Sequence, residues 1–298
     1  MASILLTGIG LISKHLAPIL ESNGHEVSFL SRSKKEYKNY KVYYWNHNKQ
    51  VIDSNAIKNT DIIIHLAGAS ISKRWTKKFK REIYDSRINS TKFLCEYLRT
   101  NKHRVKQFIL GSAIGYYGSV TTDKIFSESD SAGNDFLARI CIKWEKSLDD
   151  LPSGINNSII RTGVVFSKND GPFTKICQPI KKGFGAVIGN GKQIISWIHI
   201  EDYCNMMLYM VMNSKLNGIY NAVAPYPVSN KELTYRISRK LNKSIWLPAV
   251  PKFALKIILG QMSILATEGN VVNSEKISNT GFEFKYPYIE DALNNLLD

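Results

Sequence analysis

The sequence of 298 residues predicts an α/β fold, a doubly wound parallel sheet with a smaller C-terminal lobe. Short, continuously apolar runs recur through the first half, which is typical of strands buried on both faces. Amphipathic helical patterns separate these runs, as right-handed crossovers between parallel strands require. A glycine-rich turn directly follows the first run, and a doubly wound sheet binds nucleotides at such a turn.

The expected strands are the apolar runs at residues 4–6, 27–30, 42–45, 62–66, 108–110, 158–160 and 219–221. Helical patterns occupy Leu11 to Leu20, Trp75 to Ile83, Phe93 to Leu98 and Asn230 to Leu241. The first of these is followed by Asn23-Gly24, a helix stop signal. Strands and helices therefore alternate as a parallel sheet requires.

The regular alternation ends near residue 166, and this sets the expected domain organisation. We expect residues 1–165 to form the nucleotide-binding core, to which residues 200–225 return. Residues 166–199 and 226–298 then form a substrate lobe, with a small C-terminal domain at about 247–296. The stretch Gly183 to Gly191 holds four glycines and is expected to be a loop.

The net charge of +15 raises the question of a nucleic-acid ligand, because basic side chains neutralise phosphates. The lysines are spread along the whole chain, so we expect a solvated basic surface and no nucleic-acid partner. Residues 73–81 interleave basic and aromatic residues, but their spacing favours a core stripe with a solvated face over an RNA-binding surface. A basic surface still favours an anionic small molecule.

The four cysteines show no CxxC or Cys/His spacing, so we expect reduced thiols, no metal site and a cytoplasmic location. No signal-peptide pattern and no apolar run of about 18 residues is found, and no membrane partner is expected. The apolar stretch 253–265 is interrupted by Lys256 and Gly260, and a core-packed helix is favoured over one on a membrane surface. The oligomeric state, including a homodimer, stays open.

The turn after the first strand reads Gly8-Ile9-Gly10-Leu11-Ile12-Ser13, a GxGxxG pattern with serine in the last place. The first glycine permits the tight turn, and the second lets the backbone approach a pyrophosphate at the helix N-terminus. Between a strand and a helix, this pattern predicts a Rossmann-type dinucleotide site.

The end of the second strand decides between the two nicotinamide dinucleotides. An NAD site expects Asp or Glu about 20 residues beyond the turn, to hold the ribose 2′-hydroxyl. This chain has Ser31-Arg32 there, followed by Lys34 and Lys35. A guanidinium can bind a 2′-phosphate through two hydrogen bonds, so we predict NADP(H).

Further motifs resemble one family from end to end. They are His65-Leu66-Ala67-Gly68-Ala69, Arg74-Trp75-Thr76, Ser86-Arg87, Gly111 to Gly118, Trp144-Glu145, Arg161 to Val165, Ser196 to Ile200 and Gly281 to Phe284. Together they resemble the atypical extended short-chain dehydrogenases of the NAD-dependent epimerase/dehydratase type that carry a C-terminal domain of unknown function. The glycine turn is one residue shorter than the usual pattern of this family.

The resemblance implies cofactor contacts at Gly8, Gly10, Ile12, Ser31, Arg32, Leu66, Ala67, Glu82, Arg87 and Val165. We add Thr7, Leu11 and Gly68, which adjoin these positions. Glu82 and Arg87 could instead form a surface ion pair.

Typical members of the wider superfamily use Ser, Tyr and Lys, with the Tyr as general acid or base. Ser112 matches the serine, but Leu137 and Cys141 stand where the YxxxK pair should be. Tyr116 or Tyr117 could replace the acid, or both could pack in the cleft wall. The only YxxxK, from Tyr37 to Lys41, lies beside the third strand and is a chance match.

Arg161, Gln193 and His199 are candidates to line a substrate cleft, although packing or structural roles would also explain them. Two functions from different classes remain open. The first is an NADP(H)-dependent epimerase or reductase acting on a small carbonyl or nucleotide-sugar-like molecule. The second is a non-catalytic NADP(H)-binding regulatory protein, because the YxxxK pair is missing. A third hypothesis, less favoured than these two, is a basic RNA-associated protein.

Overall fold

The computed structural model describes residues 1–33 and 36–298. One large sheet forms the centre, with the strand order β12-β8-β6-β5-β1-β2-β3-β4 in this part of the chain. All of its strand pairs are parallel except β3 with β4, which closes the edge as an antiparallel pair. The strands are β1 (Ser3–Thr7), β2 (Glu26–Ser31), β3 (Lys41–Asn46), β4 (Val51–Ile52), β5 (Ile62–His65), β6 (Gln107–Ala113), β8 (Asn156–Thr162) and β12 (Gly218–Ala222).

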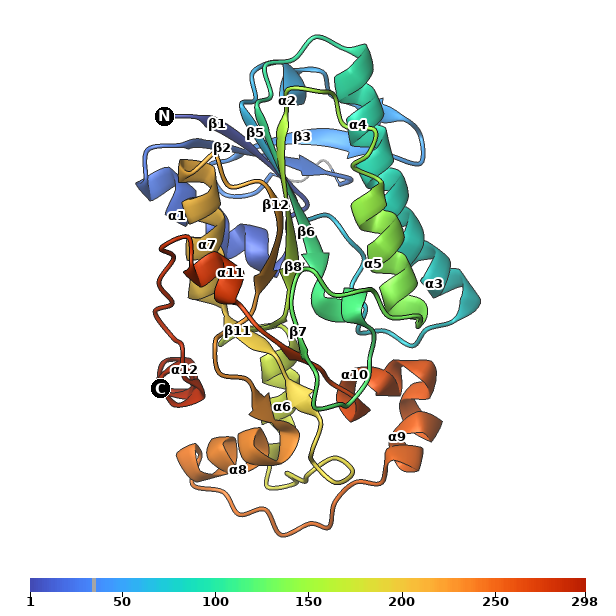
Figure 1. The fold of residues 1–298 in the computed structure, drawn as a ribbon, viewed down its shortest axis with the longest axis vertical. Helices are drawn as coiled ribbons and strands as arrows, with labels where there is room; N and C mark the ends of the chain where they lie inside the picture. The colour runs from blue at the N-terminus through green and yellow to red at the C-terminus, as the bar shows by residue number, and fades with distance from the viewer. Residues whose placement is uncertain (34–35) are drawn as a thin grey trace.

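Helices cover both faces of this sheet, as a doubly wound fold requires (Figure 1). On one face lie α1 (Leu11–Ser22) and α7 (Ile200–Met212). On the other lie α2 (Asn55–Lys58), α3 (Lys77–Tyr84), the π-helix η1 (Asp85–Asn89), α4 (Ser90–Thr100) and α5 (Phe136–Lys146). In β5, Ile62 and Ile64 join the first apolar cluster and Ile63 joins the second. The apolar run of this strand thus reflects burial on both faces.

A smaller lobe lies beyond the carboxyl ends of the strands (Figure 1). Its apolar cluster is separate from the two clusters of the sheet and includes Phe166, Phe173, Trp197, Leu233 and Leu293. The lobe's elements are β9 (Val164–Phe166), α6 (Pro172–Lys181), β10 (Ile194–Ile195), β11 (Trp197–His199), β13 (Val228–Ser229), α8 (Asn230–Lys240) and α12 (Ile289–Leu297).

Short elements connect the lobe to the sheet. They are the 3-10 helix η2 (Ile114–Tyr117), β7 (Ile125–Phe126), α9 (Lys252–Leu259), the 3-10 helix η3 (Gly260–Ser263), α10 (Ile264–Thr267), β14 (Val271–Val272) and α11 (Glu275–Ser278). Strand β14 pairs with β7, so the C-terminal segment adds a strand beside the loop after β6.

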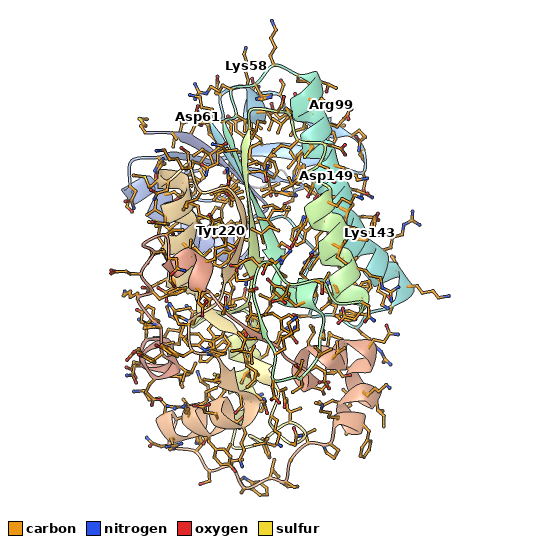
Figure 2. The ribbon with its side chains drawn as sticks, viewed as in Figure 1. Lys58, Asp61, Arg99, Lys143, Asp149 and Tyr220 are labelled. Atoms are coloured by element: carbon orange, nitrogen blue, oxygen red, sulfur yellow. The ribbon has the colours of Figure 1, made fainter. Side chains whose placement is uncertain are left out.

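Side chains fill the space between the sheet and its covering layers (Figure 2). Asp61, at the amino end of β5, accepts a hydrogen bond from the Ser3 N–H at 2.8 Å and joins two strands at the end of the molecule opposite the lobe. Tyr220 of β12 lies near the middle, where its ring contacts the ammonium of Lys276.

Most of the expected elements are present, but one expectation was wrong. The stretch 253–265 was expected to pack in the core, yet none of the residues of α9 is buried. The sequence of α9 is mainly apolar, but the helix does not pack in the core. Among the described residues, no helix is long and apolar enough to cross a membrane.

Candidate functional site

The glycine turn lies where β1 ends beside β2. Gly8 has a φ of +80°, a backbone conformation that favours glycine, and its N–H donates to the Leu30 carbonyl at 2.8 Å. A side chain at Gly8 would place its Cβ 3.4 Å from the Ala67 Cα. The turn therefore needs glycine both for its conformation and for its contact with the segment after β5.

Ser13 replaces the last glycine of the pattern and closes the turn with its hydroxyl. Its Oγ accepts the Gly10 N–H at 2.9 Å and donates to the Gly8 carbonyl at 2.8 Å. These bonds fix the shortened turn from within. The N–H groups of the first turn of α1 have no intrahelical acceptor, and this turn holds no acidic residue. It is therefore suited to an anion.

Arg32 directly follows β2, two residues beyond the Leu30 carbonyl that binds Gly8. Its side chain is exposed. Burial and, to a lesser extent, the charge of Arg32 lower the pKa of His47. The charge of Arg32 is therefore felt at His47, directly after β3. Lys34 and Lys35, also expected here, lie outside the described residues.

A buried hydrogen-bond cluster joins the end of β1 to the segment after β5. The Thr7 Oγ1 accepts the N–H groups of Leu66 and Ala67, both at 3.0 Å, and lies 2.7 Å from His65 Nδ1. Because two donors already occupy this oxygen, its own proton goes to Nδ1, and the neutral ring carries its proton on Nε2. His65 Nε2 lies 3.2 Å from the Ser90 Oγ, which donates to the Ser86 carbonyl.

Arg87 comes from the π-helix η1 and lies against the same segment. Its Nη1 donates to the Ala69 carbonyl at 3.0 Å, and its Cζ lies 3.1 Å from where a Cβ on Gly68 would be. Its guanidinium also lies over the Trp144 ring. Burial lowers the pKa of Arg87. π-helical turns are frequent at functional sites, and this one presents a cation beside Gly68.

Glu82 does not pair with Arg87. It lies on α3 with an exposed side chain, whereas the half-buried Arg87 points to Ala69. The two residues belong to consecutive helices of different types, α3 and η1. The alternative of a surface ion pair between them was therefore wrong.

A second, fully buried network lies at the carboxyl ends of β6 and β8. Ser112 donates from Oγ to the Glu145 Oε1 at 2.7 Å, and Arg161 binds both oxygens of the same carboxylate at 3.0 and 2.8 Å. The remaining nitrogen of Arg161 donates to the Tyr117 hydroxyl at 3.1 Å, which in turn donates to Asn221 Oδ1 at 2.7 Å. Each member is thus paired inside the protein.

This network limits what Ser112 and Tyr117 can do. Tyr117 is 2% exposed, and its burial raises its pKa even though Arg161 acts in the opposite direction. The Ser112 hydroxyl donates its hydrogen bond to the Glu145 carboxylate, so it is not available to donate to a substrate carbonyl. Tyr116 is less enclosed, and its ring lies directly under the guanidinium of Arg161.

Leu137 and Cys141 of α5 face η2. A Cβ on Gly115 would lie 3.5 Å from the Leu137 Cβ and 3.7 Å from the Cys141 Sγ. Burial raises the pKa of the Cys141 thiol to about 12, so it stays protonated. Neither side chain supplies the acid or the cation that a Tyr and a Lys would supply.

The three residues expected at the substrate cleft have different surroundings. Arg161 is 1% exposed within the buried network. His199 caps α7 through Nδ1, faces Asn295 through Nε2 and lies against Tyr286, which is a structural role. Gln193 donates to the carbonyls of Ile188 and Ala266, and its buried Oε1 has no partner among the described residues.

Val165 of β9 belongs to the apolar cluster shared with α1 and α7. The loop that follows β9 reaches the glycine turn, because a Cβ on Gly171 would lie 3.0 Å from Leu11 Cδ2. The first strand of the lobe therefore leads back to the N-terminus of α1. Among the described residues, no group of His, Cys, Asp and Glu is arranged to hold a metal ion.

Sequence analysis named Glu145 only within a motif of the family resemblance, whereas the structure places it between Ser112 and Arg161. One signal for this role was available. Glu145 continues the buried stripe of α5 formed by Leu137, Cys141 and Trp144, and an acid on such a face needs a buried partner.

The glycine turn, the order of the strands and the helices on both faces indicate a Rossmann-type fold, which many families share. Comparison with known sequences identifies the family. The sequence model of the NAD dependent epimerase/dehydratase family matches residues 4–222, more than half of the chain. The chain belongs to this family. A second model, a domain of unknown function termed DUF1731, matches residues 250–296 of this epimerase-family protein.

Relatives of this epimerase-family chain match it over nearly its whole length. Epimerase family protein YfhF of Bacillus subtilis is 36% identical over 294 residues, which cover 97% of this chain and 96% of the relative. The chloroplastic SDR39U1 homolog of Arabidopsis thaliana is 31% identical and is matched over 86% of its length, with 99% of this chain covered.

Solved structures share the fold. The crystal structure of human epimerase family protein SDR39U1 with NADPH superimposes with a TM-score of 0.89 at 24% identity and covers 99% of this chain and 98% of its own. UDP-glucose 4-epimerase of Thermus thermophilus in complex with NAD gives a TM-score of 0.76 at 16% identity, with 97% and 96% covered.

Proposed function

We propose that this chain binds NADP(H) at the carboxyl ends of β1, β2 and β5. The observation that carries the proposal is the hydrogen bond from the Gly8 turn to Leu30 near the end of β2, the strand that Arg32 directly follows. The turn offers backbone N–H groups and a helix N-terminus to the pyrophosphate. The guanidinium of Arg32, standing in place of a carboxylate, would bind the 2′-phosphate.

The other predicted contacts surround the same place. Leu11 and Ile12 begin α1, Ser31 precedes Arg32, and Leu66, Ala67 and Gly68 follow β5. In this proposal Arg87, whose guanidinium lies beside Gly68, would add a positive charge to the same site. The solved structure of human SDR39U1 with NADPH supports the choice of cofactor, although that of the Thermus thermophilus epimerase holds NAD.

We further propose that the chain is an NADP(H)-dependent epimerase or reductase of a small carbonyl or nucleotide-sugar-like substrate. When bound, the reduced dinucleotide would supply a hydride to a carbonyl in a reductase, whereas the oxidised form would accept a hydride and return it in an epimerase. Tyr116 is then the favoured proton donor, since Tyr117 and Ser112 are engaged in the buried network. Residues 166–199 and 226–298 would form the substrate lobe, with Gln193 Oε1 available to accept a hydrogen bond.

A second candidate is a non-catalytic NADP(H)-binding protein. The observation that favours it is the replacement of the Tyr and Lys by Leu137 and Cys141, together with the closed pairing of Ser112. In this case the nucleotide would act as a bound signal, and no proton transfer would be needed. Both candidate functions are compatible with a cytoplasmic location, which four cysteines without a disulfide favour. Both are also compatible with a homodimer.

Substitution of Arg32 tests the cofactor assignment. Arg32→Ala should weaken NADPH binding by about 10- to 150-fold, because a hydrogen-bonded charge contributes about 1.5–3 kcal/mol. Affinity for NADH should stay within about twofold, since NADH has no 2′-phosphate. Arg99→Ala, which replaces an exposed arginine on α4, is the matched control. Equal affinity of the native protein for NADH and NADPH, or unchanged binding by Arg32→Ala, would contradict the assignment.

Transfer of deuterium separates the two candidates. NADPH carrying deuterium at C4 is incubated with a panel of aldehydes, ketones and nucleotide sugars, and the products are analysed by mass spectrometry. Transfer that Tyr116→Phe abolishes while NADPH affinity is unchanged supports the enzyme. Tight NADPH binding without transfer to any compound, and without conversion of a nucleotide sugar to its epimer in the presence of NADP⁺, favours the regulatory protein.

A further inference from the structure

Helix α9 exposes apolar side chains that no other part of the described chain covers. Phe253, Ile257 and Ile258 are 69%, 72% and 68% exposed, and none of the residues of this helix is buried. Leu265 of α10 adds a further exposed side chain. Contiguous apolar surface of this kind marks an interaction site more often than scattered single residues do.

Basic residues accompany this apolar face, and acidic residues are absent from the helix. Residues 247–267 contain no Asp or Glu. Lys252 and Lys256 lie one turn apart on α9, so long aliphatic stems with charged ends flank the apolar side chains. Lys252 pairs with Glu268, whereas no ion-pair partner for Lys256 is found among the described residues.

The start of α3 extends the positive charge. Lys80 donates to Gln261 Oε1 at 2.5 Å, and the Arg74 guanidinium lies 3.5 Å from where a Cβ on Gly260 would be. These contacts hold the segment before and within α3 against the end of α9, and both helices lie on the same side of the molecule (Figure 1). Residues 69–81 are also free of acids and contain six basic residues: Lys73, Arg74, Lys77, Lys78, Lys80 and Arg81.

The shape and charge of this surface favour one kind of occupant. Helix α9 lies at the edge of the lobe and has no buried residue, so its apolar side chains are presented to the outside of the molecule. A second copy meeting this face across a two-fold axis would bring like charges together. Single-stranded nucleic acid stacks its bases on aromatic rings, whereas the exposed side chains of this surface are mainly aliphatic, which disfavours nucleic acid as the occupant. The surface of an anionic lipid bilayer has negatively charged headgroups above an apolar layer. It therefore matches both the basic residues and the exposed apolar side chains of this surface.

We propose that α9 and the basic residues of 73–81 form a peripheral binding surface for an anionic lipid bilayer. The apolar side chains of α9 enter the boundary between headgroups and acyl chains, and the lysines contact phosphate headgroups. The helix lies in the interface and does not cross it. The surface is independent of the proposed NADP(H) site, and it revises the expectation that the chain has no membrane partner.

Flotation of the full-length protein with lipid vesicles tests this surface. Binding is expected to vesicles of phosphatidylcholine mixed with an equal part of phosphatidylglycerol, and not to vesicles of phosphatidylcholine alone. Binding should weaken as salt is raised, because screening reduces attraction to the headgroups. NADPH affinity, measured in the same preparations, should not depend on the vesicles.

Paired substitutions separate the surface from the general positive charge of the chain. Phe253→Ser with Ile257→Ser should weaken vesicle binding by roughly tenfold or more, because two inserted apolar side chains are lost. Lys77→Glu with Lys78→Glu should weaken it comparably. The controls are Met212→Ser, also highly exposed but on α7, and Lys58→Glu, at the opposite end of the molecule (Figure 2). All the replaced side chains are exposed, so unchanged melting temperatures are expected.

Three results would overturn the proposal. The first is absence of binding to the anionic vesicles. The second is unchanged binding by Phe253→Ser with Ile257→Ser together with an equal loss per reversed charge in the Lys77 and Lys78 variant and in Lys58→Glu, which would indicate attraction by net charge alone. The third is a protein whose mass in solution, measured by light scattering, halves in Phe253→Ser with Ile257→Ser, because the occupant would then be a second copy.

Discussion

Glu145 illustrates how one buried carboxylate organises the end of the sheet. It accepts a hydrogen bond from the Ser112 hydroxyl and two more from Nε and Nη2 of Arg161, which is itself buried. Replacing one partner of such a pair leaves the other charge uncompensated in the interior. Glu145→Ala should therefore lower the free energy of unfolding by about 3–5 kcal/mol, as measured by urea denaturation.

A surface pair supplies the comparison for this prediction. Glu96 and Arg99 lie three residues apart on α4 with both side chains largely exposed. Glu96→Ala should change the free energy of unfolding by at most about 1 kcal/mol, because water screens exposed pairs. Similar losses in Glu96→Ala and Glu145→Ala would contradict the role given to the buried carboxylate.

At the scale of elements, Thr7 joins β1 to the segment after β5. Thr7→Val keeps the shape of the side chain but leaves two N–H groups and His65 Nδ1 without their partner. Each unpaired buried group costs about 1–3 kcal/mol. The variant should melt at a lower temperature and bind NADPH more weakly, because Leu66 to Gly68 would no longer be held against Gly8.

The conservative replacement tests the hydroxyl itself. Thr7→Ser retains the oxygen, so it should preserve most of the thermal stability and the NADPH affinity measured by calorimetry. If Thr7→Val behaved like the native protein while Thr7→Ser lost stability and affinity, packing of the methyl group and not the hydrogen bonds would hold this segment.

The elements that local pattern determines could be predicted from the sequence. The β5 run is apolar throughout because both faces are buried, and the Gly8 turn follows from a φ that favours glycine. The pairing of Ser112, Glu145 and Arg161 could not be predicted, because their partners come from β6, α5 and β8 and meet only in three dimensions. Helix α9 was assigned wrongly because its composition matches a core helix, and exposure depends on what packs against it.

At the scale of the molecule, the sheet and the lobe place two hydrogen-bond networks at the same edge. The Thr7 and His65 network lies at the ends of β1 and β5, and the Glu145 network lies at the ends of β6 and β8. Parallel strands bring these ends together, so a ligand at the Gly8 turn would extend toward Ser112. The first network orders the segment that would hold the cofactor, whereas the second restricts the chemistry beside it.

Two buried histidines also link the stability of the whole molecule to pH. Burial lowers the pKa of His65 from 6.5 to about 3 and that of His199 to about 4. In the unfolded chain both return to the ordinary value, so between about pH 6.5 and pH 4 the unfolded state binds protons that the folded state does not. The free energy of unfolding should therefore fall on acidification through this window, by about 1.4 kcal/mol per pH unit for each histidine.

Substitution of one histidine isolates its share of this slope. His199→Gln removes a titrating group, so its free energy of unfolding, measured by urea denaturation at several pH values, should fall less steeply between pH 6.5 and 4 than that of the native protein, whatever its stability at pH 7. A slope in His199→Gln equal to that of the native protein would mean that the folded chain protonates His199 readily. The contacts with Asn295 and Tyr286 would then not hold the C-terminal helix against β11 in the neutral form that the structure implies.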